Sequence, residues 1–77
     1  MTKEERFLIF LHKLASERGD LYCPIDRYTV GEMVGLHTKG IDTTCNVLAQ
    51  VNFIKKVGPT QVALTPHGEA LVLKLKG

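Results

Sequence analysis

The sequence is poor in cysteine, tryptophan and long apolar runs, and each shortage excludes a class of protein. Only two cysteines, Cys23 and Cys45, occur in 77 residues, and they do not form a CxxC pair. Two are too few for the disulfide framework of a small secreted domain, so we expect a reducing environment. No apolar run approaches the roughly 20 residues that span a bilayer, and the first residues do not resemble a signal peptide. We therefore expect a soluble, cytoplasmic protein without a membrane partner.

Motifs for catalysis and cofactor binding are also missing. The chain has no glycine-rich phosphate loop, no nucleophile elbow and no carboxylate pair that indicates a cleft. Its histidines and cysteines are not at metal-ligand spacing, although a zinc or redox-sensing site is kept as an alternative. With no tryptophan and few other aromatic residues, stacking on single-stranded nucleic acid has little support. The sequence predicts a protein that is not an enzyme and that holds no metal or cofactor.

Charge is low and unevenly distributed. The formal net charge is +2, which is weak evidence for a polyanionic partner. Residues 53–77 carry four lysines against one glutamate, whereas residues 26–52 carry two basic and three acidic side chains. The positive charge is therefore concentrated in the last third of the chain.

Capping signals predict the first two helices. Thr2 and Glu5 form a capping box for a helix that ends at Gly19. The stretch 21–25 is short and extended, and its proline suits only an edge strand. A second capping box predicts a helix over 29–35, preceded by a hydrophobic staple. The residues of this box and its staple are Thr29 with Glu32 and Tyr28 with Met33.

The second half of the chain predicts a third helix, a hairpin and a last helix. The third helix begins near Thr38, and His37 before it is a candidate to cap it or to touch a phosphate. Two strands, 53–57 and 61–64, are joined by a tight turn. A threonine and a proline begin the last helix, over 66–76. The inward stripe of the third helix is Ile41, Cys45 and Leu48, widened by Val47 and Val51, and Asn52 ends the helix in a left-handed conformation.

This order of elements resembles the winged helix-turn-helix superfamily, especially bacterial and archaeal regulators of the MarR and ArsR kind. Two segments carry the resemblance: VGEMVGLHTKGIDTTCNVLAQVNFIKKV is similar to a helix-turn-helix entering its first wing strand, and VALTPHGEAL to a second wing strand entering a closing helix. The resemblance implies an α+β, mostly α, single domain over 1–77. Within it lie a helix-turn-helix at about 29–52, a wing hairpin at about 53–65 and a closing helix at about 66–76.

The resemblance also implies that the third helix enters the major groove of double-stranded DNA. Asparagine and glutamine can bond adenine, threonine can contact a thymine methyl group, and aspartate can accept from cytosine. The expected base-reading residues are Thr43, Asn46, Gln50 and Asp42. The expected phosphate contacts are Arg27, Thr38, Lys39, Lys55 and Lys56. The alternative is a solvated polar face, on which Asp42 only favours the helix N-terminus and the paired lysines only keep an edge strand soluble.

Two apolar stretches predict a homodimer. FLIFL (7–11) and ALVL (70–73) present apolar side chains all around their helices, and one small core is not expected to cover every side. Two copies would also double a sparse set of phosphate contacts and hold two helices about 34 Å apart, one turn of DNA. The expected dimer interface is Phe7, Leu8, Phe10, Leu11, Val72 and Leu73. The alternative is that the two helices cover each other within one chain.

The sequence therefore predicts a small transcriptional regulator that binds double-stranded DNA as a homodimer. Two departures from the family pattern favour another interpretation. The outward face of the third helix has a single lysine, Lys39, and the turn of the hairpin, GPTQ, is uncharged. A winged helix of this kind can serve instead as a protein-interaction module without sequence-specific DNA binding.

Overall fold

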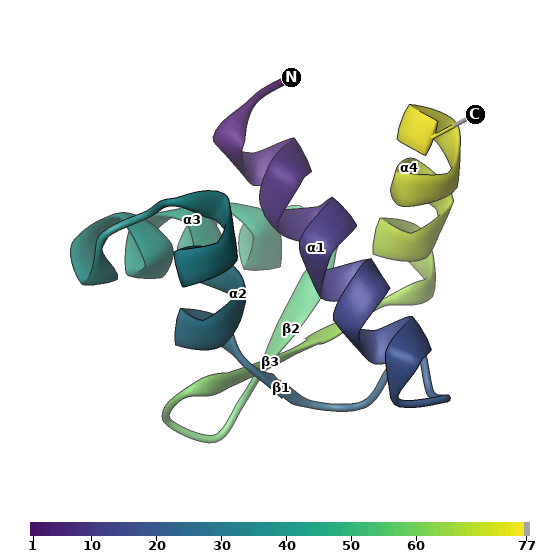
Figure 1. Ribbon diagram of the computed structural model, residues 1–77, viewed down its shortest axis with the longest axis horizontal. Helices are drawn as coiled ribbons and strands as arrows, with labels where there is room; N and C mark the ends of the chain where they lie inside the picture. Colours follow the sequence, from purple (N-terminus) through teal and green to yellow (C-terminus); the bar gives the residue numbers. More distant parts are fainter. Residues whose placement is uncertain (77) are drawn as a thin grey trace.

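The computed structural model describes residues 1–76 as four helices and a three-stranded antiparallel sheet (Figure 1). This is a mostly helical α+β arrangement, and the order of its elements is the predicted one. The elements are α1 (Lys3–Glu17), β1 (Ile25–Asp26), α2 (Arg27–Val34), α3 (Thr38–Gln50), β2 (Ile54–Val57), β3 (Gln61–Leu64) and α4 (Pro66–Lys76).

The sheet has the strand order β1–β3–β2, so β3 is the central strand. β2 and β3 form the expected hairpin, in register from Ile54 opposite Leu64 to Val57 opposite Gln61. β1 contributes only two residues at the edge of the sheet, where the proline before it costs no ladder hydrogen bond.

α1 lies at the centre of the molecule, and α2, α3, α4 and the sheet pack against it (Figure 1). Phe7, Leu8 and Leu11 of α1 and Val72 of α4 are completely buried within the single chain. The prediction that these four side chains meet a second copy is therefore wrong. One small core covers α1 on several sides because its neighbours come from elements spread over the whole chain. Phe10 and Leu73, the other two predicted interface residues, are half-buried and exposed, respectively.

Local signals place most helix ends correctly. The capping box of Thr2 and Glu5 is complete, with both reciprocal hydrogen bonds formed. Asn52 follows α3 with φ 63°, the predicted left-handed conformation. At the start of α4, Thr65 Oγ1 accepts a hydrogen bond from the backbone N–H of Gly68 at 3.0 Å. These signals act over three or four residues, so they operate whatever the rest of the chain does.

α2 begins two residues earlier than predicted. Its N-cap is Asp26, whose side chain accepts a hydrogen bond from the backbone N–H of Tyr28 at 2.8 Å. Thr29 and Glu32 lie inside the helix and cannot form the predicted capping box. The staple of Tyr28 with Met33 is wrong for the same reason, since a staple needs a residue before the N-cap.

α3 buries a narrower stripe than predicted. Its buried residues are Ile41, Thr44, Cys45 and Leu48. Val47 and Val51, expected to widen this stripe, are 43% and 46% exposed. At 100° per residue, Thr44 lies closer to the middle of the inward arc than either valine, and it takes the remaining place in the core.

Candidate nucleic-acid interface

The outward side of α3 carries four exposed polar residues in one line. Lys39, Thr43, Asn46 and Gln50 follow one another at spacings of four, three and four residues, which a helix brings to one face. All four side chains are exposed. We call this line the α3 stripe. It contains three of the four residues predicted to read bases, and the chain's own packing leaves them open to a partner.

The threonine in the α3 stripe is partly used by the helix itself. Thr43 Oγ1 donates a hydrogen bond to the backbone carbonyl of Lys39, one turn earlier, at 3.0 Å. The hydroxyl proton is therefore not available to a partner. What Thr43 can offer is its methyl group and the oxygen lone pairs, which suits the predicted contact with a thymine methyl group.

Asp42 lies beside the α3 stripe and is held by α2. Its Oδ1 accepts a hydrogen bond from Tyr28 Oη at 2.9 Å and lies 3.9 Å from Arg27 Nη1. The hydrogen bond to Asp42 raises the pKa of the Tyr28 hydroxyl, which keeps this donor protonated. The structure thus gives Asp42 a role in joining α2 to α3, and because its side chain is 46% exposed, the base reading predicted for it stays a prediction.

Arg27, predicted to contact phosphate, is only 6% exposed, so that prediction is wrong. Its Nη2 donates to the carbonyl oxygen of Pro59 at 3.1 Å, and its backbone N–H donates to the carbonyl oxygen of Thr60 at 3.0 Å. Together with the ion pair to Asp42, these bonds hold the turn of the hairpin against the start of α2. Arg27 is a structural residue that fixes the hairpin relative to α3.

The other predicted phosphate contacts lie at the surface. Thr38 and Lys39 are exposed in the first turn of α3, and Lys55 and Lys56 are consecutive exposed residues of β2. Lys56 Nζ donates a hydrogen bond to Asn46 Oδ1, so β2 and the α3 stripe are in direct contact. Lys56 and the polar face of α3 therefore belong to one continuous surface, whereas the side chain of Lys55 leaves the opposite face of the strand.

Sequence reasoning missed one lysine of this region. A hollow of about 400 Å³ at the start of α3 is lined by Lys3 as well as by His37, Lys39 and Thr43. Lys3 belongs to α1, and no spacing in the sequence relates it to α3. His37 makes no side-chain capping bond, contrary to one of its two predicted roles, and is exposed.

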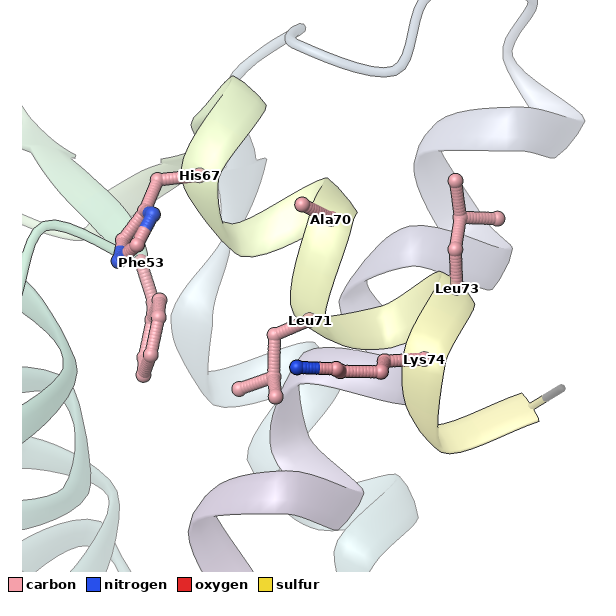
Figure 2. Close-up of a pocket in the computed structure, with 6 residues that line it drawn as sticks. All are labelled: Phe53, His67, Ala70, Leu71, Leu73 and Lys74. Carbon is pink, nitrogen blue, oxygen red and sulfur yellow. The ribbon is translucent and has the colours of Figure 1, made fainter.

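A second hollow lies on the outer side of α4 (Figure 2). It has a volume of about 520 Å³, and its lining is mostly apolar. Figure 2 shows Phe53, Leu71 and Lys74 on one side of α4 and Leu73 on the other. The rings of Phe53 and His67 stack with their centroids 4.8 Å apart. The lining residues are Phe53, His67, Ala70, Leu71, Leu73 and Lys74.

One of the two cysteines, Cys45, is a core residue of α3. Burial raises the pKa of the Cys45 thiol to about 11, so Cys45 stays protonated at neutral pH and packs as a small apolar residue. Among residues 1–76, no three His, Cys, Asp or Glu side chains gather closely enough to share a metal ion. In the same part of the chain, every helix is too short or too polar to cross a membrane.

Comparisons with family models, with curated proteins and with solved structures gave no significant match to this chain. The winged-helix resemblance therefore stays a prediction. The function proposed below rests on the arrangement of α3, β2 and α4 in this chain.

Proposed function

We propose that this chain is a winged helix-turn-helix domain that binds double-stranded DNA through α3 and the β2–β3 hairpin. On this proposal α2 and α3 form the helix-turn-helix, the hairpin is the wing, and α4 is the closing helix. The observation that carries it is the exposed α3 stripe, joined by Lys56 to a strand with two lysines. The major groove admits an α-helix, and this face offers side chains that bond base edges. A small cytoplasmic transcriptional regulator is the role that such binding suits.

Affinity would come mainly from phosphate contacts, each of which releases about one counterion. Asp42 is the acidic residue on α3, and the positive charge of Arg27 partly neutralises its negative charge. This reduces the repulsion between Asp42 and phosphates. The contact with Asn46 also holds one hairpin lysine close to α3. The four lysines available for phosphate contacts are Lys3, Lys39, Lys55 and Lys56.

Charge reversal on β2 tests the proposal. Changing Lys55→Glu together with Lys56→Glu is expected to weaken binding to a random-sequence duplex at least about tenfold. The log–log dependence of affinity on salt should become shallower by about two, because two phosphate contacts are lost. Fluorescence anisotropy over a series of salt concentrations measures both quantities.

The matched control carries the same change of charge in the last part of α1 and at its C-cap. Lys13→Glu with Arg18→Glu also alters two exposed basic residues, far from β2 in the sequence, and should keep most of the affinity. Equal losses in the two double variants would show that only net charge matters and would contradict the proposed surface.

One observation favours a protein-interaction module as the second candidate. Val47 and Val51 are large apolar residues exposed on α3, beside the α3 stripe. Apolar side chains that are exposed together and rimmed by polar residues are a feature of surfaces that bind proteins. A salt slope near zero for the unmodified protein would favour this candidate over DNA binding.

We also propose that two copies pair through the outer side of α4. The support is Leu73, which is 56% exposed, and the adjoining apolar hollow of about 520 Å³. In a symmetric dimer Leu73 and the residues that line the hollow are buried in both copies. Each of them therefore contributes twice to the free energy of association. Pairing would also double the number of lysines that contact one duplex, which is small for a single domain.

Leu73→Glu tests the pairing. At tens of micromolar we expect the unmodified chain to sediment as a dimer and the Leu73→Glu variant as a monomer, because a charged side chain would be buried at the interface. Val47→Glu, at a comparably exposed apolar position on α3, should remain dimeric. An unmodified chain that sediments as a monomer would exclude the dimer.

A further inference from the structure

The contact between Lys56 and Asn46 fixes the orientation of the asparagine amide. A lysine ammonium group has only donors, so Asn46 must turn its carbonyl oxygen, Oδ1, toward Lys56 Nζ. The oxygen and nitrogen of an asparagine amide are distinguished by their hydrogen-bond partners. Because Lys56 can only donate, the oxygen of Asn46 must face it and the nitrogen must point away. This contact uses one of the two lone pairs of Oδ1 and leaves the NH2 group of Asn46, which donates hydrogen bonds, fully free.

This orientation changes which base the side chain suits. An asparagine that reads adenine accepts from N6 with its oxygen and donates to N7 with its nitrogen. In Asn46 the oxygen is already bonded to a cation. The amide nitrogen of Asn46 and the ammonium group of Lys56 together offer adjacent donors. Guanine presents two adjacent acceptors, O6 and N7, in the major groove, and adenine presents an acceptor beside a donor.

We propose that Asn46 and Lys56 act as a donor pair that selects guanine at one position of the DNA site. The inference rests on the proposed duplex binding and adds the base that α3 prefers. It reverses the expectation from the sequence alone, in which asparagine pairs with adenine. One carboxylate oxygen of Asp42, the residue on α3 that could have read cytosine, is already engaged by Tyr28.

A random-oligonucleotide selection with three proteins tests the inference. Lys56→Met removes the partner of Asn46, and Lys55→Met removes the same charge from the neighbouring exposed position of β2. Each change removes one cation, so both should weaken binding to a random-sequence duplex by a similar factor and make the salt slope shallower by about one. The unmodified protein and Lys55→Met should enrich guanine over adenine at one position, by roughly 5- to 150-fold. Lys56→Met frees Oδ1, so adenine should replace guanine there.

The outcomes separate the inference from the function on which it rests. Asn46→Ala should remove the base preference at that position without abolishing binding. Identical preferences for Lys56→Met and Lys55→Met, or adenine preferred by the unmodified protein, would overturn the donor pair while leaving duplex binding intact. Failure of the unmodified protein to select any duplex would overturn the proposed function and this inference with it.

Discussion

Phe7→Ala is expected to destabilise the domain by about 3–5 kcal/mol, the loss typical of deleting a buried aromatic side chain. Phe7 is completely buried where α1 meets the rest of the core, so the change leaves a cavity that the surrounding helices can only partly fill. A domain of 77 residues has a total stability of about 4–12 kcal/mol. The variant should therefore be marginally stable or unfolded. Urea denaturation followed by circular dichroism measures the difference.

Phe10→Ala is the matched control, since it makes the same chemical change one turn further along α1. Phe10 is half-buried, and we expect a smaller loss of about 1–2 kcal/mol. The dependence on protein concentration is the second readout. If the stability lost in Phe7→Ala varied with dilution, Phe7 would lie at a subunit interface, because only dissociation links stability to concentration.

Elements that depend on neighbouring residues could be predicted from the sequence. The capping box of Thr2 with Glu5, the left-handed Asn52 and the threonine cap of α4 all act within one turn, and all are present. The hairpin could be predicted for a similar reason, because two short segments with strand-forming residues flank a glycine–proline turn. The exposed polar face of α3 follows from helical spacing alone.

The role of Arg27 could not be predicted, because its partners are distant in the sequence. The carbonyl oxygen of Pro59 and the carboxylate of Asp42 meet its guanidinium only after the hairpin and α3 have folded. Arginine is rarely buried, so a surface role is the ordinary expectation. The early start of α2, by contrast, has a local cause, the cap that Asp26 forms with the N–H of Tyr28, and the bond from the Arg27 N–H to Thr60 of the hairpin adds to it.

Apolar patterns predicted that side chains are buried, but not whether the same chain or a second copy covers them. The run at 7–11 does surround its helix with apolar side chains, and three of its five residues are completely buried. The covering elements belong to the same chain, since α1 has neighbours on several sides (Figure 1). Conversely, Val47 and Val51 are apolar and exposed. Hydrophobicity alone does not distinguish a core from an interface or from an open surface.

Gly68→Ala is expected to destabilise the domain by about 3 kcal/mol, the upper end of the range for overpacking. A Cβ atom on Gly68 would overlap the carbonyl oxygen of Phe53 and lie 2.9 Å from its carbonyl carbon. Rotation of a side chain cannot relieve an overlap with the main chain. α4 would have to move away from the residue that precedes β2, and the N–H of Thr65, which donates to that same carbonyl at 3.3 Å, would move with it.

Alanine substitutions at two other glycines serve as controls for this prediction. Gly40→Ala lies within α3 with no atom closer than 4.0 Å, so it should stabilise the domain by up to about 1 kcal/mol through helix propensity. Gly31→Ala would overlap the side chain of Ile41, a buried residue, so a loss is expected there too, smaller than at Gly68 because the overlap is with a side chain and not with the main chain. Urea denaturation should rank Gly40→Ala first and Gly68→Ala last. Because Phe53 also lines the hollow proposed for pairing, a Gly68→Ala variant as stable as the unmodified chain would contradict both the packing of α4 and the interface built on it.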